Sequence, residues 1–194
     1  MAKRLLAAIN DTGFFLQEWL ANPQHTGAVA PSSPRLAAAM AHWLPADPDS
    51  FVLELGPGTG AVTQALFNRG LREDRLVAIE RNPKMADKLR ERFPLAHIIT
   101  GDAWQMDSLL REHDEQIESV GAVISSLPLL NFPPHEADAL AKKIRAILEP
   151  KGKLVQYSYH LSNLRPRGTA YFRPLTSKII WLNLPPARVS VYQK

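Results

Sequence analysis

The feature that most constrains the fold of this chain is an apolar run that leads into three closely spaced glycines, Phe51 to Gly60 (FVLELGPGTG). A short apolar run, a glycine-rich turn and then helix-compatible residues up to Phe67 predict a strand, a tight turn and a helix. Glycine allows positive φ and lets a ligand approach the main chain, while the first turn of a helix offers free N–H groups. The stretch therefore predicts a cradle for a small molecule.

The spacing of the glycines narrows the choice of ligand. Gly56, Gly58 and Gly60 bring the third glycine one residue earlier than the G-x-G-x-x-G of dinucleotide-binding turns, so a pyrophosphate is not required. A second apolar run, Leu76 to Glu80, ends in a carboxylate 20 residues after Gly60, where an acid can accept hydrogen bonds from both ribose hydroxyls. The alternative is an ordinary turn between a strand and a helix, and Glu80 argues against it.

Together with Thr100-Gly101-Asp102-Ala103, these motifs resemble the class I S-adenosylmethionine-dependent methyltransferases. The resemblance implies S-adenosylmethionine as cofactor and S-adenosylhomocysteine as product. It also implies that Glu80 holds the ribose and that Asp102 and Ala103 hold the adenine, while Trp104 either stacks on the ring or packs in the core. The full cofactor-binding set that we expect is Val29, Pro31, Ser33, Glu54, Gly56, Gly58, Thr59, Gly60, Glu80, Arg81, Asp102, Ala103, Trp104 and Ser125.

Three residues of this set belong to a loop of small residues before the first strand, Thr26 to Pro34. The loop leads into a helix that begins near Pro34, with Ser32 or Ser33 as its N-cap. A capped helix is the simpler interpretation, but a loop this small and rigid could also close over the methionine end of the cofactor.

The expected fold class is α/β, with a doubly wound, mostly parallel sheet of seven strands in a Rossmann-like class I methyltransferase fold. Six strands are parallel and one, near the C-terminal edge, is antiparallel. The last three are expected at Lys153 to Tyr159, Lys178 to Leu184 and Ala187 to Tyr192. One domain covers residues 1–194, with an N-terminal helix region at 1–24 and an arginine-containing substrate loop at 161–177.

Composition excludes several classes of chemistry. With 194 residues and 45% hydrophobic content, one domain with a sizeable core is expected. The chain has no cysteine, which removes disulfides, thiolate metal sites and cysteine nucleophiles. No apolar run reaches the roughly 18 residues that span a bilayer, and no signal peptide is evident, so we expect a cytoplasmic protein without a metal. The net charge of +4 favours anionic partners.

The first 20 residues place apolar side chains near helical spacing, with Phe14, Phe15 and Trp19 among them. One interpretation is a helix that packs on the domain. The other is an amphipathic helix at a membrane interface, supported by Lys3 and Arg4 beside the aromatic residues. On the second interpretation Phe15 and Trp19 contact the substrate.

The expected fourth strand, Gly121 to Ser125, ends in the loop Ser126-Leu127-Pro128-Leu129, which should face the transferable methyl group. The loop resembles the [Asp/Asn/Ser]-Pro-Pro-[Tyr/Phe] or Asn-Leu-Pro-Tyr loop of amino methyltransferases in its first three positions. Leu129 departs from that pattern, because those enzymes stack a flat base on an aromatic residue there. We expect Ser126 and the Leu127 carbonyl to orient an amine, and Tyr159 to contact it. Tyr157 shares a face of the fifth strand with Tyr159.

The segment Leu161 to Ser177 carries Arg165, Arg167 and Arg173 among prolines and aromatic residues. A solvated connection is the simpler interpretation, and phosphate recognition by the arginines is the sharper one. With T-G-A-V-A-P-S-S, S-S-L-P-L-L-N-F-P and Q-Y-S-Y, the chain resembles bacterial phospholipid N-methyltransferases, which convert phosphatidylethanolamine stepwise to phosphatidylcholine. The expected partners are a phospholipid substrate and the anionic inner surface of the cytoplasmic membrane, without an obligatory protein partner.

Two alternatives stay open. An RNA adenine N-methyltransferase fits the positive charge and the Ser-Leu-Pro loop, although Leu129 and the lack of an added RNA-binding domain disfavour nucleic acid. A noncatalytic protein that binds S-adenosylmethionine is the alternative from another class.

Overall fold

The computed structural model describes residues 32–114, 117–127, 129, 132–159, 161 and 169–194. The expected N-terminal helix region therefore lies outside the described residues, as do Phe15, Trp19, Val29, Pro31, Arg165 and Arg167. Within the described ranges, no helix has the length and apolar character needed to cross a bilayer.

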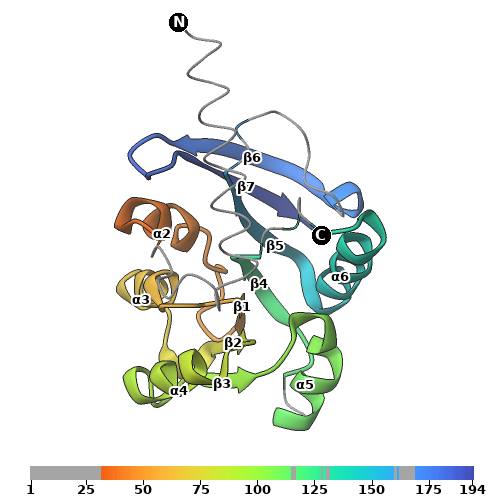
Figure 1. Ribbon diagram of the computed structural model, residues 1–194. Helices are drawn as coiled ribbons and strands as arrows, with labels where there is room; N and C mark the ends of the chain where they lie inside the picture. Colours follow the sequence, from red (N-terminus) through yellow and green to blue (C-terminus); the bar gives the residue numbers. More distant parts are fainter. Residues whose placement is uncertain (1–31, 115–116, 128, 130–131, 160, 162–168) are drawn as a thin grey trace, which may run out of the picture.

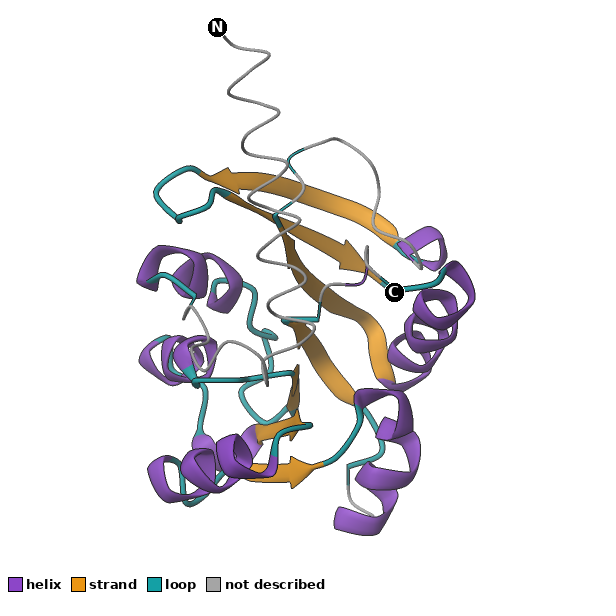
Figure 2. Cartoon of the chain, in the orientation of Figure 1, coloured by secondary structure: helices purple, strands orange, loops and turns teal. Residues whose placement is uncertain are grey.

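Seven strands form one sheet in the order β3-β2-β1-β4-β5-β7-β6, which Figures 1 and 2 show from the same side. The strands are β1 (Val52–Leu55), β2 (Leu76–Glu80), β3 (His97–Thr100), β4 (Val120–Ser125), β5 (Leu148–Ser158), β6 (Arg173–Ile180) and β7 (Ala187–Gln193). β7 is antiparallel to both of its neighbours, and the other pairs are parallel. The prediction of six parallel strands and one antiparallel strand is confirmed.

Helices cover both faces of the sheet (Figure 1). The helices α2 (Pro34–Ala41), α3 (Ala61–Asn68) and α4 (Pro83–Arg92) pack on one face. The helices α5 (Met106–His113) and α6 (Pro134–Ile147) pack on the other. The side chains of a strand point alternately to its two faces. Val52 of β1 therefore joins the core under α2 and α3, while Leu53 and Leu55 join the core under α5 and α6. Short 3-10 turns lie at Glu73–Arg75, Ala103–Gln105 and Thr169–Tyr171.

Two predicted strands have different bounds in the structure. The strand expected from Lys153 is β5, which begins earlier, at Leu148, and ends at Ser158. The strand expected from Lys178 is β6, which begins at Arg173 and ends at Ile180, so the last part of the expected arginine loop is strand. β6 is the edge of the sheet, most of its side chains are exposed, and a register shift follows Pro174. An edge strand tolerates proline and polar residues, so the apolar pattern used for prediction is missing there.

The order of the strands reverses between β1 and β4. The chain runs outward from β1 to β2 and β3 and then returns to the other side of β1 with β4. In a doubly wound sheet, ligands bind beyond the carboxyl ends of the strands at such a switch point. This edge of the sheet is therefore where the candidate site is expected.

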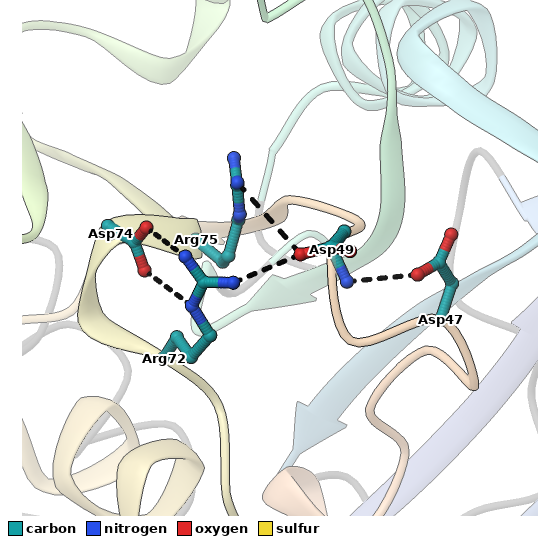
Figure 3. A network of polar contacts seen from close by, with 5 residues as sticks. All are labelled: Asp47, Asp49, Arg72, Asp74 and Arg75. Atoms are coloured by element: carbon teal, nitrogen blue, oxygen red, sulfur yellow. Dashed lines mark hydrogen bonds and ion pairs between the residues drawn. The ribbon is translucent and has the colours of Figure 1, made fainter.

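A network of ion pairs closes the opposite edge of the sheet, before β1 and β2 (Figure 3). The Arg72 guanidinium donates to Asp74 at 3.0 and 2.5 Å and to Asp49 at 3.0 Å, while Arg75 lies 4.0 Å from Asp49. The hydrogen bond from Arg72 holds the pKa of Asp74 below its ordinary value. Arg72, Asp74 and Asp49 have exposed side chains, so these ion pairs stabilise the fold little, and they lie away from the candidate site.

Candidate functional site

The three glycines of the turn after β1 all have positive φ, at 71°, 55° and 76°. Gly56 N–H donates to the Ile79 carbonyl of β2 at 3.0 Å, which ties the turn to the neighbouring strand. A Cβ added at Gly60 would lie 2.8 Å from Leu89 of α4, whereas one added at Gly58 would meet nothing within 4 Å. Gly60 is therefore needed for packing, and Gly58 faces open space where a ligand can approach the backbone.

Glu54 lies beneath this turn and is fully buried. Its Oε2 accepts a hydrogen bond of 2.7 Å from the Thr63 hydroxyl in the first turn of α3, whereas its Oε1 is buried without a partner among the described residues. Burial raises the pKa of Glu54 to about 7, and the nearby Glu80 adds to the shift. A buried carboxylate with an unused oxygen favours a cationic ligand nearby.

Glu80 ends β2 beside the glycine turn and is buried. Its Oε2 accepts from Gly58 N–H at 2.9 Å, and its Oε1 accepts from Asn82 N–H at 2.8 Å. Each carboxylate oxygen retains a further lone pair, which a ribose hydroxyl could use. Glu80 thus holds the backbone of the turn at Gly58, and its carboxylate oxygens remain available as hydrogen-bond acceptors beside the turn.

Asp102 follows β3, on the strand next to Glu80, and Gly101 N–H donates to the Glu80 carbonyl at 3.0 Å. The Asp102 Oδ1 caps a 3-10 turn by accepting from Trp104 N–H at 3.0 Å, and its Oδ2 lies 4.0 Å from the Nε of the exposed Arg81. The structure therefore gathers Glu80, Arg81 and Asp102 at one end of the cradle.

Trp104 packs against the other elements at this end. Its ring meets Phe132 edge to face at a centroid distance of 4.5 Å, and its indole N–H donates to the Glu136 carbonyl of α6 at 3.3 Å. Ala103 is buried in the core beneath α5 and α6. The core alternative therefore describes the observed packing of Trp104, and its stacking on adenine stays a prediction.

The end of β4 lies against the glycine turn. Ser126 N–H donates to the Leu55 carbonyl at 2.9 Å, and the Leu127 side chain lies 3.1 Å from the position of a Cβ at Gly56. Ser125 is fully buried, and its hydroxyl accepts from Leu127 N–H at 3.3 Å. Leu129 is buried in the core beneath α5 and α6, so its side chain offers no surface to a flat base.

The Leu127 carbonyl accepts two hydrogen bonds in this structure. Leu129 N–H donates to it at 2.9 Å and the Gln156 amide at 3.3 Å, so both of its lone pairs are used. The predicted role of this carbonyl in orienting an amine stays untested, and it would require one of these bonds to open.

Tyr157 and Tyr159 lie together, as expected from their spacing, with ring centroids 5.5 Å apart. Both are buried on the face covered by α2, and burial raises the pKa of each phenol. Their hydroxyls join a network with Ser32 and with Asn183, whose Oδ1 accepts from Ser33 N–H at 3.2 Å. Ser33 is the N-cap of α2, accepting from Leu36 N–H at 3.2 Å, and Pro34 begins the helix. This confirms the predicted cap.

The structure places Arg173 away from the edge of the sheet where the crevice is expected. Arg173 is the first residue of β6, its guanidinium donates to Gln193 Oε1, and Gln193 pairs with Lys153. Arg173 lies toward the amino ends of the parallel strands. The length of β6, about 20 Å of extended chain, separates it from Ile180 at the carboxyl end. The proposed crevice is at the other edge.

Two residues that sequence reasoning missed lie at the correct edge. Gln156 of β5 is buried, and the Oε1 of its amide has no partner among the described residues. Arg188 of β7 is half-buried and donates to the Ser177 hydroxyl at 3.0 Å and to the Leu161 carbonyl at 2.6 Å. No carboxylate among the described residues forms an ion pair with it.

Register places Gln156 and Arg188 on the same face of the sheet. Gln156 pairs with Ser190 of β7, so Arg188 is its diagonal neighbour, and such positions are about 7–8 Å apart. Gln156 also pairs with Ser125 of β4, and Ser190 pairs with Ser177 of β6. A polar row thus crosses four strands at the edge where the glycine turn lies. The polar residues at these positions were a signal in the sequence, but their alignment depends on strand pairing.

This geometry defines a class of protein, because a glycine cradle at the switch point, with carboxylates at the carboxyl ends of β1, β2 and β3, fits a nucleoside cofactor with a cationic tail. Comparison with known proteins agrees. Residues 52–152 match the family described as "Methyltransferase domain". The chain belongs to this family, and it is a class I S-adenosylmethionine-dependent methyltransferase.

Individual relatives add detail. The chain is similar to an ornithine lipid N-methyltransferase of Singulisphaera acidiphila, at 29% identity over 92% of this chain and 94% of the relative. It is also similar to the ribosomal RNA small subunit methyltransferase A of Acidobacterium capsulatum, at 39% identity, but over only 44% of this chain and 32% of that protein. The magnesium protoporphyrin IX methyltransferase of Synechocystis PCC 6803, solved with bound S-adenosylmethionine, has the same fold, with a TM-score of 0.60 and 17% identity over 83% of this chain and 79% of that one.

The residues present fit the cofactor S-adenosylmethionine. The open side of Gly58 gives room for a ligand against the backbone, and the unused Oε1 of Glu54 can attract a positive charge. Among the described residues, no group of three or more histidine, aspartate or glutamate side chains could hold a metal ion.

Proposed function

We propose that this methyltransferase transfers methyl groups to the amine of phosphatidylethanolamine and of its methylated intermediates, toward phosphatidylcholine. The observation that carries the proposal is the pairing of an unused buried acceptor, Gln156 Oε1, with the guanidinium of Arg188 one diagonal away on the same face. A phosphatidylethanolamine headgroup has its amine only a few bonds from a phosphate. A site that methylates it needs an amine acceptor beside an anion site.

In this proposal, the glycine cradle would hold the cofactor, with Glu80 binding the ribose and Asp102 the adenine. Glu54 would attract the positively charged end. The bound cofactor supplies an electrophilic methyl group, so a C–N bond forms as the C–S bond breaks.

The amine must lose a proton before each attack, because a primary ammonium has a pKa near that of lysine, about 10. We assign the orientation of its lone pair to Ser126 and Gln156, because Gln156 pairs with Ser125, the residue before Ser126, and its side chain donates to the Leu127 carbonyl. The Tyr159 ring or hydroxyl contacts the growing ammonium, and cation–π attraction is worth roughly 1–2 kcal/mol for a well-placed ring. The proton leaves to solvent at the crevice.

Among the described residues, Arg188 is better placed than Arg173 for the anion site, while the other two predicted arginines, Arg165 and Arg167, lie outside the described residues. The two Nη groups of Arg188 are used by neutral oxygens of Ser177 and Leu161, which a phosphate could displace at low cost. Guanidinium binds phosphate with paired donors, so Arg188 would fix the headgroup. The full-length similarity to an enzyme named for ornithine lipid supports a lipid amine, and an ornithine headgroup likewise joins an amine to an anion.

The first experiment compares possible methyl acceptors in one reaction mixture, and a second compares variants of the protein. Labelled S-adenosylmethionine is incubated with the protein, phosphatidylethanolamine vesicles, ornithine lipid vesicles and total RNA, and each fraction is counted. We expect label in phosphatidylethanolamine and in its monomethyl and dimethyl products. Label in ornithine lipid alone would correct the headgroup, and label in RNA or in no fraction would overturn the proposal.

Arg188→Gln tests the anion site, with Arg173→Gln as the matched control at the opposite end of the same sheet. We expect turnover on vesicles to fall at least tenfold in Arg188→Gln, as expected for the loss of a paired charged hydrogen bond, with cofactor affinity intact. Arg173→Gln should retain wild-type turnover. Equal rates for both variants would remove Arg188 from the site.

RNA adenine N-methylation is the second candidate, because a ribosomal RNA small subunit methyltransferase matches 44% of the chain. That match spans about a third of the relative's length, and Leu129 is buried where a base would stack. Methyl incorporation into RNA with strong salt dependence would support this candidate instead.

A further inference from the structure

The loop between β6 and β7, residues 181–186, carries an unusual concentration of exposed apolar side chains. Trp181 is 66% exposed, Leu182 71% and Leu184 94%. The loop contains no charged residue. Single exposed apolar residues are normal on a protein surface, but a cluster of three within four residues marks an interaction surface. We call residues 181–186 the β6–β7 tip.

The tip is held in place from inside. Asn183 is buried, its Nδ2 donates to the Pro185 carbonyl at 2.6 Å, and its Oδ1 accepts from Ser33 N–H at the start of α2. The buried Ile180 and Ala187 close the strand pair below it. Since Asn183 and Pro185 point inward, Leu182 and Leu184 are fixed outward.

The position of the tip relates it to the site. The last strand pair before it is Ile180 with Ala187, and Arg188 next to it pairs with Ser158 at the carboxyl end of β5. The tip therefore projects beyond the carboxyl edge of the sheet, where the glycine turn, Ser126 and Gln156 also lie. Figure 1 shows this hairpin end above α2, on the side of the molecule where β6 and β7 meet.

The charge of the chain changes toward this end. Residues 1–149 contain 15 lysines and arginines and 19 aspartates and glutamates. Residues 150–194 contain eight lysines and arginines and no acidic residue, and Lys178 and Arg188 flank the tip within three residues. The two cations Lys178 and Arg188 beside an apolar, tryptophan-bearing loop complement an anionic lipid surface, where tryptophan prefers the headgroup level.

We propose that the β6–β7 tip inserts into the interfacial layer of an anionic membrane and holds the crevice against the lipid headgroups. The inference rests on the proposed function in one respect, that a lipid substrate is available to the crevice once the tip is inserted. Insertion itself does not depend on methyl transfer. It also places the membrane contact on a different segment from residues 3–20, for which an interfacial helix is one of the two interpretations.

The experiment uses the absence of cysteine in the chain. Leu184→Cys in the full chain gives a single site for an environment-sensitive dye, and Leu95→Cys is the control. Leu95 is 68% exposed and lies two residues before β3, at the opposite edge of the sheet. We expect a blue shift at Leu184→Cys when vesicles of phosphatidylglycerol and phosphatidylcholine are added, and none at Leu95→Cys. These vesicles lack a primary amine, so the readout is independent of methyl transfer.

A matched pair of variants measures the contribution to binding. Leu182→Ser and Leu184→Ser should each lower vesicle partitioning about three- to tenfold, because an exposed leucine loses its burial in lipid. Leu95→Ser should leave it unchanged. Both tip variants should keep wild-type cofactor affinity and wild-type turnover on a short-chain amine lipid dissolved below its micelle concentration.

The other possible occupants of the tip give different results. A second copy of the chain would produce a dimer in sedimentation without vesicles, which Leu182→Ser would dissociate. Residues 1–31 folded over the tip would give a blue-shifted dye before vesicles are added. Either outcome, or equal partitioning of Leu182→Ser and Leu95→Ser, would overturn the inference. Normal vesicle binding without methyl transfer to any lipid would leave the inference standing and remove the proposed function.

Discussion

Replacing the buried Glu54 by glutamine should remove a specific part of the pH dependence of stability. Burial raises the pKa of Glu54 to about 7 from an ordinary value of 4.5. The carboxylate is fully buried, and only one of its oxygens has a hydrogen-bond partner among the described residues. The folded protein therefore binds the Glu54 proton more tightly than the unfolded chain does.

The sign follows from this difference. Below pH 4.5 the side chain is protonated in both states and has no effect on the pH dependence. As the pH rises, the unfolded chain releases the proton first, so the folded state loses stability until the pH exceeds about 7, where the loss is complete. For these two pKa values the loss between pH 5 and pH 8 is about 2.5 kcal/mol, or roughly 5–10 °C in Tm for a domain of this size.

Urea unfolding of the wild type and of Glu54→Gln, without cofactor, measures the effect at both pH values. Other titrating groups cancel in the difference between the two proteins. We expect the free energy of unfolding of the wild type, relative to the variant, to fall by about 2.5 kcal/mol from pH 5 to pH 8. Glu112→Gln, an exposed carboxylate on α5, controls for the loss of one negative charge. A difference that does not change with pH would refute the assignment of a raised pKa to Glu54.

Three further predictions address the cofactor, the glycine turn and the membrane. Glu80→Ala should weaken S-adenosylmethionine binding about 10- to 100-fold by calorimetry, because it removes acceptors worth about 1.5–3 kcal/mol and loosens the turn; unchanged affinity would mean that the ribose lies elsewhere. Gly60→Ala should cost at least about 1–2 kcal/mol of stability, since its φ is 76° and its Cβ would lie 2.8 Å from Leu89 of α4. Gly58→Ala should cost less stability but lose cofactor affinity. Equal unfolding midpoints of the two variants in urea would contradict the packing role of Gly60. If residues 3–20 form an interfacial helix, Trp19→Glu should release the protein from anionic vesicles in sedimentation assays, and insensitivity to it would indicate a helix packed on the domain.

The strand–turn–helix around the glycines was predictable because each of its determinants is local. The apolar run of β1, the positive φ values of the turn and the first turn of α3 all occur within about 15 residues of sequence. The carboxylate at Glu80 was found for the same reason, since a strand of five residues ends there. The cap of α2 at Ser33 followed from the neighbouring Pro34.

The substrate half of the site was not predictable in the same way. Arg173 and Arg188 are both arginines in the basic C-terminal segment, and no local pattern separates them. Pairing with Gln193 places Arg173 at one edge of the sheet, and pairing with Ser158 places Arg188 at the other. The direction of β7 decides which arginine faces the crevice.

The sequence by itself determined the class of fold, the cofactor and the end of the sheet where the cofactor binds, because these depend on short-range patterns of glycine, apolar runs and strand-end carboxylates. Only the tertiary structure decided that Gln156 and Arg188 are neighbours and that Trp181, Leu182 and Leu184 are exposed at the same edge. Strand register and direction join residues more than 30 positions apart, and the edge strand β6 has exposed side chains that leave no apolar period to read. The physical reason is that pairing between distant strands is set by the packing of the whole sheet, which no single segment of the chain encodes.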